Sequence, residues 1–172
     1  AKLSTSGARL WLKLLGAVST TGSSVAVDAA GSPVIAGWTL GALPGQAAVR
    51  GNDFFVAKYN SSDGSTLWIS QFGTDSGDYL NAVAISSSSD DIYVAGYTEG
   101  SFSGSTNQGI SDIFVARLSS NGTLVWTRMI GTYGRDGGYA IAVDDASNAL
   151  YVTGGVSDSV NGSAYDGSGQ DA

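Results

Sequence analysis

The sequence predicts an all-β fold made of β-propeller blades, each with four antiparallel strands, and three observations carry that prediction. The 172 residues include 25 Gly and two Pro, and 42% of them are apolar and spread along the chain. Short runs rich in Val, Ile, Tyr and Phe alternate with turns of Ser, Asp, Asn and Gly, as in proteins with many short strands. A unit of 57 to 59 residues recurs three times, which is typical of repeat architectures.

The repeat is most visible at its tryptophans. Trp11, Trp68 and Trp126 stand at intervals of 57 and 58 residues, and the runs VAVD, VAIS and IAVD keep an interval of 58. Large aromatic side chains dominate burial between packed sheets. We therefore expect the three tryptophans to form a structural core between neighbouring sheets, with a sugar-stacking platform as the minor alternative.

The middle copy shows the strands of one unit. Apolar runs at 83–86, 92–98, 113–118 and 124–130 are separated by turn-forming residues, and no window has the period of a helix. Four short strands in a unit of this length favour a propeller blade. A β-sandwich is the main alternative, although sandwiches do not need a tandem repeat.

A family resemblance adds to this pattern. The stretch AVAISSSSDDIYVAGYTEGSFSG (82–104), with SDIFVARLSSNGTLVW (111–126), resembles the SBBP-type β-propeller repeat and, more distantly, the NHL-type repeat. The resemblance covers nearly the whole chain and is weakest at residues 40–50. It implies a propeller fold in a secreted or cell-surface protein, and it supplies no catalytic residues to transfer to this sequence.

The similar NHL pattern divides the chain into blades. There the AVAVD…YVAG hairpin forms the two inner strands and the FVAK…LW hairpin the two outer strands. Residues 24–73 and 82–131 are then whole blades, 1–16 is an outer half-blade hairpin, and 140–156 is an inner one followed by a loop at 157–172 toward the next strand. Residues 1–172 thus form a single propeller segment, and its three blade equivalents fall short of the roughly 4–8 blades of a closed propeller.

The half blades predict a partner, because unpaired strand edges invite pairing. One expectation is self-association, in which 140–156 of one copy pairs with 1–16 of the next. Such a head-to-tail contact makes a ring or a filament. The other expectation is a longer parent chain that completes the halves. The sequence starts AKLSTSG, without Met or a signal peptide, and we therefore expect it to be a processed or excised piece of such a chain.

Composition excludes several classes of function. The formal net charge is −7, and the eight bases are scattered, so we expect no nucleic-acid partner. The absence of Cys and His removes the Ser-His and Cys-His nucleophile systems and the usual zinc ligand. No run of about 20 apolar residues exists, so we expect no membrane insertion. We predict that the chain is not an enzyme and needs no cofactor.

The longer loops, at 73–81, 99–112 and 157–171, are expected on one face, which is the candidate binding face. Trp38 and Tyr97 share a repeated position and are candidate ligand-face aromatics. The stretch DGSGQD offers the weak calcium candidates Asp166, Ser168 and Gln170, although it lacks the closing Glu of a calcium-binding loop. Turn capping is the alternative role for these three residues.

Two further sets of acids stand out. Asp53, Asp112 and Asp171 precede a strand in every copy and are expected to accept backbone hydrogen bonds in tight turns. Asp75 and Asp78 could act as the carboxylate pair of a glycosidase or lyase. The stronger expectation for these two is that both are solvated loop residues.

Three Asn-x-Ser/Thr sequons, at Asn60, Asn121 and Asn161, are candidate N-glycosylation sites. They fall in predicted turns or loops, where all three asparagines are expected to be exposed. Occupancy is expected if the source is a secreted eukaryotic protein, and is much less expected in a bacterial one.

These observations favour a non-catalytic extracellular structural or assembly module of a cell-surface appendage, filament or adhesin. The alternative is a propeller that binds glycan or protein through its long-loop face. A polysaccharide lyase or hydrolase domain is the least favoured. The expected location is extracellular or at the cell surface.

Overall fold

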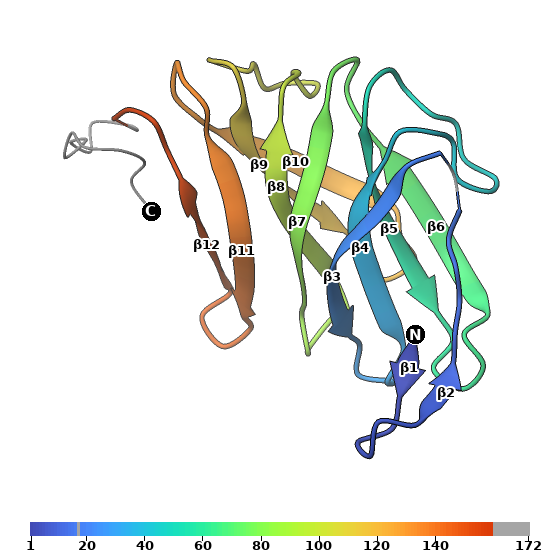
Figure 1. The fold of residues 1–172 in the computed structure, drawn as a ribbon. Coiled ribbons are helices and arrows are strands. Elements are labelled where there is room, and N and C mark those ends of the chain that lie inside the picture. The colour runs from blue at the N-terminus through green and yellow to red at the C-terminus, as the bar shows by residue number, and fades with distance from the viewer. Residues whose placement is uncertain (17, 160–172) are drawn as a thin grey trace.

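The computed structural model describes residues 1–16 and 18–159 (Figure 1). This part of the chain contains strands and no helix, and therefore no helical segment that could cross a membrane. The strands, in chain order, are β1 (Lys2–Leu3), β2 (Arg9–Trp11), β3 (Thr20–Val27), β4 (Pro33–Thr39), β5 (Asp53–Tyr59), β6 (Thr66–Phe72), β7 (Asp78–Ile85), β8 (Ile92–Thr98), β9 (Asp112–Leu118), β10 (Leu124–Ile130), β11 (Gly137–Asp144) and β12 (Ala149–Gly155).

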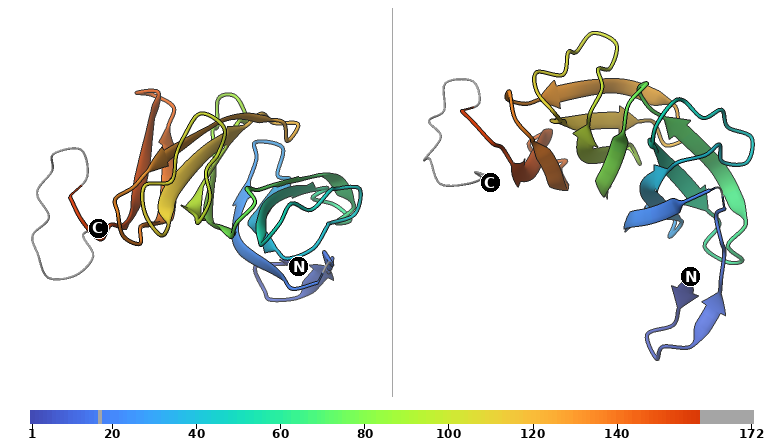
Figure 2. Two further views of the ribbon diagram at one scale, coloured as in Figure 1. Left: turned by 90° about the horizontal axis from the view of Figure 1, so that it is seen from above. Right: turned by 45° about the horizontal axis from the view of Figure 1, so that its top comes forward.

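The strands form antiparallel sheets that follow one another along the chain. β3–β4–β5–β6 and β7–β8–β9–β10 are four-stranded sheets in which each strand pairs with its neighbour in sequence, whereas β1–β2 and β11–β12 are two-stranded. Figure 2 shows the sheets arranged along an arc in chain order, with the β1–β2 hairpin at one end and the β11–β12 hairpin at the other. The predicted all-β fold and its four-stranded antiparallel sheets are confirmed.

The strand that opens each of the last three sheets contains a bulge and is longer than its apolar run predicts. The pairing with the next strand shifts at residues 22–24 in β3, at 80–82 in β7 and at 138–140 in β11. An extra residue on one strand interrupts the alternation of inward and outward side chains. For this reason β7 begins at Asp78, although its apolar run starts only at residue 83.

A glycine lies opposite each of these bulges. A Cβ added at Gly37, Gly96 or Gly154 would come within 2.0 to 2.2 Å of a backbone oxygen of the bulged strand. No side chain fits at that distance, because the two backbones approach too closely. The repeated glycine of VIAGWT, YVAGYT and YVTGGV is therefore a consequence of the bulge.

The main core lies between the two four-stranded sheets. Phe54 of β5 and Phe114 of β9 stack with 4.9 Å between ring centroids, and Phe102 from the β8–β9 loop packs against both, at 6.1 and 5.5 Å. Aromatic pairs at such distances add to the stabilisation from burial. The other buried members are Val34, Ala36, Val56, Leu80, Val83, Ile92, Val94, Ala116 and Leu118.

A smaller cluster lies on the other face of the β3–β6 sheet. It contains Phe55, Ala57 and Tyr59, which alternate along β5 with the residues of the main core, together with Leu43. Both faces of this sheet are therefore apolar, which is expected of a sheet that lies between two others.

The long loops and the short turns lie at opposite ends of the strands. In Figure 1 the β4–β5 loop (40–52) and the β8–β9 loop (99–111) lie at the upper end, whereas the β7–β8 and β11–β12 turns lie at the lower end. Within the described residues, the longer loops thus share one end of the molecule, as the strand alternation predicts.

Candidate functional site

Tryptophan from one sheet packs on a glycine turn of the next sheet. Trp68 of β6 lies against the β9–β10 turn at Gly122, where an added Cβ would come within 2.7 Å of the indole ring. Trp11 of β2 lies in the same way against Gly64 in the β5–β6 turn, at 2.8 Å. Gly122 and Gly64 have φ values of 87° and 71°, so the turn needs glycine for its backbone as well as for the ring.

Hydrogen bonds accompany both contacts. Trp11 Nε1 and Lys2 Nζ donate to the carbonyl oxygen of Ser61, at 3.1 and 2.8 Å. Ser70 Oγ donates to the carbonyl oxygen of Gly122 at 2.7 Å. These bonds hold the turn of one sheet against the last strands of the sheet before it.

Trp126 of β10 occupies the equivalent position but has different neighbours. Its half-buried ring lies 6.3 Å from the ring of Tyr93, and the guanidinium of Arg128 lies 5.7 Å from its centroid. No glycine of the described residues approaches it as Gly122 approaches Trp68. Within the described part of the chain, the Trp126 contact therefore lacks a glycine turn.

An apolar groove of 480 Å³ lies between the β1–β2 hairpin and the neighbouring face of β3, β4 and β5. Val25 and Val27 of β3 line it and are 60% and 59% exposed. Val83, the residue of β7 equivalent to Val25, is only 9% exposed because it packs in the core between the sheets. Contiguous exposed apolar surface of this kind marks a candidate interaction surface.

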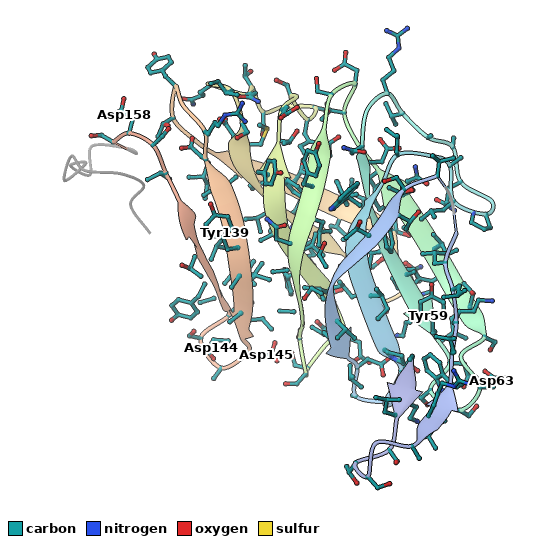
Figure 3. The ribbon with its side chains drawn as sticks, viewed as in Figure 1. Tyr59, Asp63, Tyr139, Asp144, Asp145 and Asp158 are labelled. Atoms are coloured by element: carbon teal, nitrogen blue, oxygen red, sulfur yellow. The ribbon has the colours of Figure 1, made fainter. Side chains whose placement is uncertain are left out.

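The β11–β12 turn is tied to the preceding sheet by a carboxylate, and Figure 3 shows Asp145 at this turn. Asp145 accepts hydrogen bonds from Ser86 Oγ at 2.6 Å and from Ser87 N and Oγ, both at 2.7 Å. The bonds from the Ser86 and Ser87 hydroxyls lower the pKa of Asp145 to about 2. A similar contact joins the two four-stranded sheets: Asp90, in the β7–β8 turn, accepts a hydrogen bond from Ala29 N, in the β3–β4 turn of the sheet before it, at 3.2 Å. The sequence analysis did not predict the contact of Asp145 with the preceding sheet. The run of serines before Asp90, which supplies the donors, was the one local sign of it.

Two aspartates meet where the four-stranded sheets join, below the long loops. Asp78 is fully buried, and its carboxylate accepts hydrogen bonds from Thr98 Oγ1 at 2.5 Å and from Thr74 N at 2.6 Å. A Cβ added at Gly73 would lie 2.3 Å from Asp53 Oδ1 and 2.9 Å from Asp78 Oδ2, so the two carboxylates lie close together. Burial raises the pKa of Asp78 to about 6, and the charge of Asp53 adds to the shift.

The same arrangement recurs one sheet later. Asp112 begins β9, and burial raises its pKa, with a further contribution from Asp136. As predicted, the repeated aspartates accept backbone hydrogen bonds: Val49 N donates to Asp53 Oδ2 at 2.8 Å, and Gln108 N donates to Asp112 Oδ2 at 3.0 Å. In the described part of the chain, Oδ1 of Asp53 and of Asp112 has no hydrogen-bond partner. Both pairs bridge neighbouring sheets, and the raised pKa of Asp78 and of Asp112 favours retention of a proton on these two residues.

Asp75 and Asp78 do not form the solvated pair that their spacing suggests. Asp75 is exposed, whereas Asp78 is buried and begins β7. The expectation of two solvated loop residues is wrong for Asp78, because the bulge extends the strand back to this residue.

Trp38 and Tyr97 are brought together by a third aromatic residue. Tyr79 of β7 stacks on Tyr97 of β8 with 4.8 Å between ring centroids, and it meets Trp38 of β4 edge-on at 5.5 Å. Asn52 Nδ2 donates to the Tyr79 hydroxyl at 2.7 Å. Burial, with Tyr79 beside it, raises the pKa of Tyr97. Trp38 and Tyr97 are half-buried, so the cluster keeps some ring surface accessible near the long loops. Tyr79 was missed because it precedes the predicted strand.

Two sequon asparagines lie in turns and stabilise them. Asn60 Oδ1 accepts hydrogen bonds from Ser62 N and Oγ at 2.8 and 2.7 Å. Asn121 Oδ1 accepts hydrogen bonds from Ser119 Oγ at 2.6 Å and from Thr123 N at 3.2 Å. Asn121 is exposed as expected, but Asn60 is half-buried, because its turn lies beneath Trp11 and Lys2.

The remaining candidates lie outside the described residues. These are the sequon Asn161, the calcium candidates Asp166, Ser168 and Gln170, and the repeated Asp171. In residues 1–16 and 18–159, no group of three or more His, Cys, Asp and Glu side chains gathers as metal ligands would.

Comparison with known proteins adds no further assignment. No protein-family model matches the chain, and a search of curated proteins found no significant relative.

Proposed function

We propose that this chain is a non-catalytic structural module of an extracellular or cell-surface assembly, such as an appendage, filament or adhesin, built from SBBP-type β-propeller repeats. Each four-stranded sheet is one blade, and the two-stranded sheets are halves of blades that a neighbour completes. The module would act by presenting sheet faces and strand edges to that neighbour.

One observation carries this proposal: equivalent residues are covered in one blade and uncovered in another. Val83 packs against the preceding blade and is 9% exposed, whereas Val25 has no such cover and is 60% exposed. Val25 is exposed at a position where the equivalent residue of the other blade is buried. Such apolar surface favours association, because its removal from water is favourable by roughly 25 cal/mol per Å². The exposed groove beside β3 and the edge of β12 thus support assembly as the function.

The repeated contacts between blades support the structural part of the proposal. The tryptophan–glycine contact, the buried carboxylates and the turn contact of Asp145 all join one blade to the next. Function in such an arrangement rests on positions that recur, whereas a catalytic site normally differs from one repeat to the next.

The proposal is tested by measuring whether the 172-residue chain associates with itself. Sedimentation velocity over a range of concentrations measures the association, and electron microscopy shows the assemblies that form. We expect concentration-dependent association, which Val25→Asp weakens because it places a charge in the apolar groove. Tyr133→Asp is the matched control, since Tyr133 is 84% exposed and does not line the groove. A chain that stays monomeric at every concentration contradicts the proposal.

The cluster of Trp38, Tyr79 and Tyr97 favours a second candidate function, the binding of glycan through the long-loop end. Stacked aromatic rings with partly accessible faces suit the apolar faces of sugars, and Asn52 supplies a polar group beside them. Binding to a glycan array that Tyr97→Ala abolishes and Tyr133→Ala preserves would support this candidate. Equal binding by both variants would contradict it.

A further inference from the structure

We propose that the partner of β12 and Trp126 is a second copy of this chain, whose β1–β2 hairpin completes the β11–β12 sheet and whose Gly7 packs on Trp126. This inference rests on the proposed function, and it specifies the partner and the contacts of the assembly.

The tryptophan–glycine contact identifies the acceptor. Trp11 packs on Gly64 and Trp68 packs on Gly122, so each tryptophan takes the glycine turn of the next blade. If Trp126 follows the same rule, it packs on a glycine turn of the next blade, which the described residues of the same chain do not supply. Gly7, between β1 and β2, is at the equivalent position.

The turn at Gly7 has the required geometry. Its φ is 84°, beside 71° at Gly64 and 87° at Gly122. Gly7 N donates to the carbonyl oxygen of Ser4 at 2.9 Å, as Gly122 N donates to that of Ser119 at 2.8 Å. Nothing lies within 4 Å of a Cβ added at Gly7, whereas indole rings lie within 3 Å at the other two glycines. The surface above Gly7 is therefore free to receive an indole.

Strand register gives the second contact. In both whole blades the second strand pairs with the third, through Val34↔Lys58 and Tyr93↔Arg117. β12 is the second strand of its sheet, and in the described part of the chain it pairs with β11 alone. The same register places Tyr151 of β12 opposite Lys2 in β1 of the other copy.

The apolar faces give the third contact. Val34 of one blade and Val83 of the next are members of the main core, and Ala26 and Ile85 pack against it. Tyr151 is the β12 residue equivalent to Val34, and it is 62% exposed. The groove of 480 Å³ is lined by Val25 and Val27, the equivalents of Val83 and Ile85. Tyr151 of one copy thus fits the groove of the other, where the space suits its larger ring.

A charge pair matches the same arrangement. Lys58 Nζ lies 2.6 Å from Asp28 Oδ2 within the β3–β6 sheet. The equivalent residues in the completed sheet are Lys2 of one copy and Asp144 of the other. Opposite charges at equivalent places favour this partner over an unrelated strand.

The β1–β2 and β11–β12 hairpins of one copy lie at opposite ends of the arc (Figure 2), so in this arrangement the two halves of a completed sheet come from different copies. One copy cannot bring its own β1 to its own β12. Two copies joined at both junctions hold six four-stranded sheets, within the roughly 4–8 blades of closed propellers. We therefore expect a ring of two copies, with two identical head-to-tail junctions.

Engineered disulfides test the junction, and the chain has no cysteine of its own to interfere. Paired residues on antiparallel strands have Cα atoms about 4.5–5.5 Å apart, which suits a disulfide. The chain carrying both Lys2→Cys and Tyr151→Cys is oxidised and run on a non-reducing gel. We expect a covalent dimer of two 17.4 kDa chains, and none with Lys2→Cys and Tyr133→Cys. Longer cross-linked ladders would overturn closure by two copies.

Glycine variants provide a second test that needs no cross-link. Gly7→Ala adds a methyl group where Trp126 of the other copy would pack, so we expect the dimer dissociation constant to rise about tenfold or more. Gly104→Ala is the matched control, because Gly104 of the β8–β9 loop also has positive φ, 81°, with nothing within 4 Å, and does not line the groove. Equal dissociation constants for the two variants would overturn the Trp126–Gly7 contact.

The outcomes separate this inference from the function on which it rests. A chain that associates but gives no Lys2–Tyr151 cross-link overturns the junction and leaves the structural function standing. A chain that never associates overturns both.

Discussion

The junction between the two four-stranded sheets and the groove beside β3 contain equivalent residues with different burial. Val83 and Ile85 are covered by the preceding sheet, while Val25 and Val27 stand about 60% exposed at the same positions. The strands themselves are alike in length and pairing. Burial at these positions therefore depends on the neighbouring sheet and not on the strand, so the two regions allow the contribution of a neighbour to be measured within one molecule.

The largest effect is expected from the phenylalanines at equivalent positions in β5 and β9. Phe114 lies between the sheets and stacks on Phe54, whereas Phe55 lines the groove. We predict that Phe114→Ala lowers the free energy of unfolding by about 3–5 kcal/mol. Phe55 is also buried, at 1% exposure, but Phe55→Ala should cost less, because the space it leaves adjoins the groove and can be filled by solvent. Urea unfolding at low protein concentration, where association is minimal, measures both losses.

Equal losses for Phe114→Ala and Phe55→Ala would contradict this view, since they would show that the groove is as closed as the junction. A smaller loss for Phe55→Ala that grows with protein concentration would instead show that a second copy closes the groove.

The next effect concerns the carboxylates at the junction. The pKa of Asp78 is raised from 3.8 to about 6 by burial, so between these pH values the folded state binds more protons than the unfolded chain. The free energy of unfolding should therefore fall as pH rises from about 4 to about 6, by at most about 3 kcal/mol. Urea unfolding across this range measures the slope.

Asp78→Asn should reduce the slope, because an amide does not titrate, and leave the smaller part that comes from the raised pKa of Asp112. Asp75→Asn is the matched control, since Asp75 is exposed in the adjoining loop. An unchanged slope in Asp78→Asn would assign the titration to another group.

The sequence predicted the strands far better than the contacts between sheets. β8 and β10 match the apolar runs 92–98 and 124–130, because side-chain alternation and flanking turns depend on local sequence alone. The start of β7 was missed, because a bulge breaks that alternation and leaves polar residues in the strand. Tyr79 was missed with that start, because it lies before the predicted strand. Asp145 was missed for a different reason: its partners Ser86 and Ser87 come from the neighbouring sheet.

The smallest effect gives the most direct comparison, since it uses the same substitution in both regions. Val83→Ala removes two methyl groups from the closed junction and should lower the free energy of unfolding by about 1.5 kcal/mol. Val25→Ala removes the same groups from a side chain that is 60% exposed, so the loss should stay within about 0.5 kcal/mol at low concentration. Urea unfolding of the two variants in parallel gives the difference.

Concentration then distinguishes an empty groove from an occupied one. If the second copy covers the groove, Val25→Ala becomes costlier as the concentration rises, because the mutation then also weakens association. Val83→Ala should show no such trend beyond that of the unmodified chain, since its neighbour belongs to the same chain. A Val25→Ala loss that stays constant while the chain associates would show that copies meet elsewhere, and the head-to-tail junction would have to be abandoned.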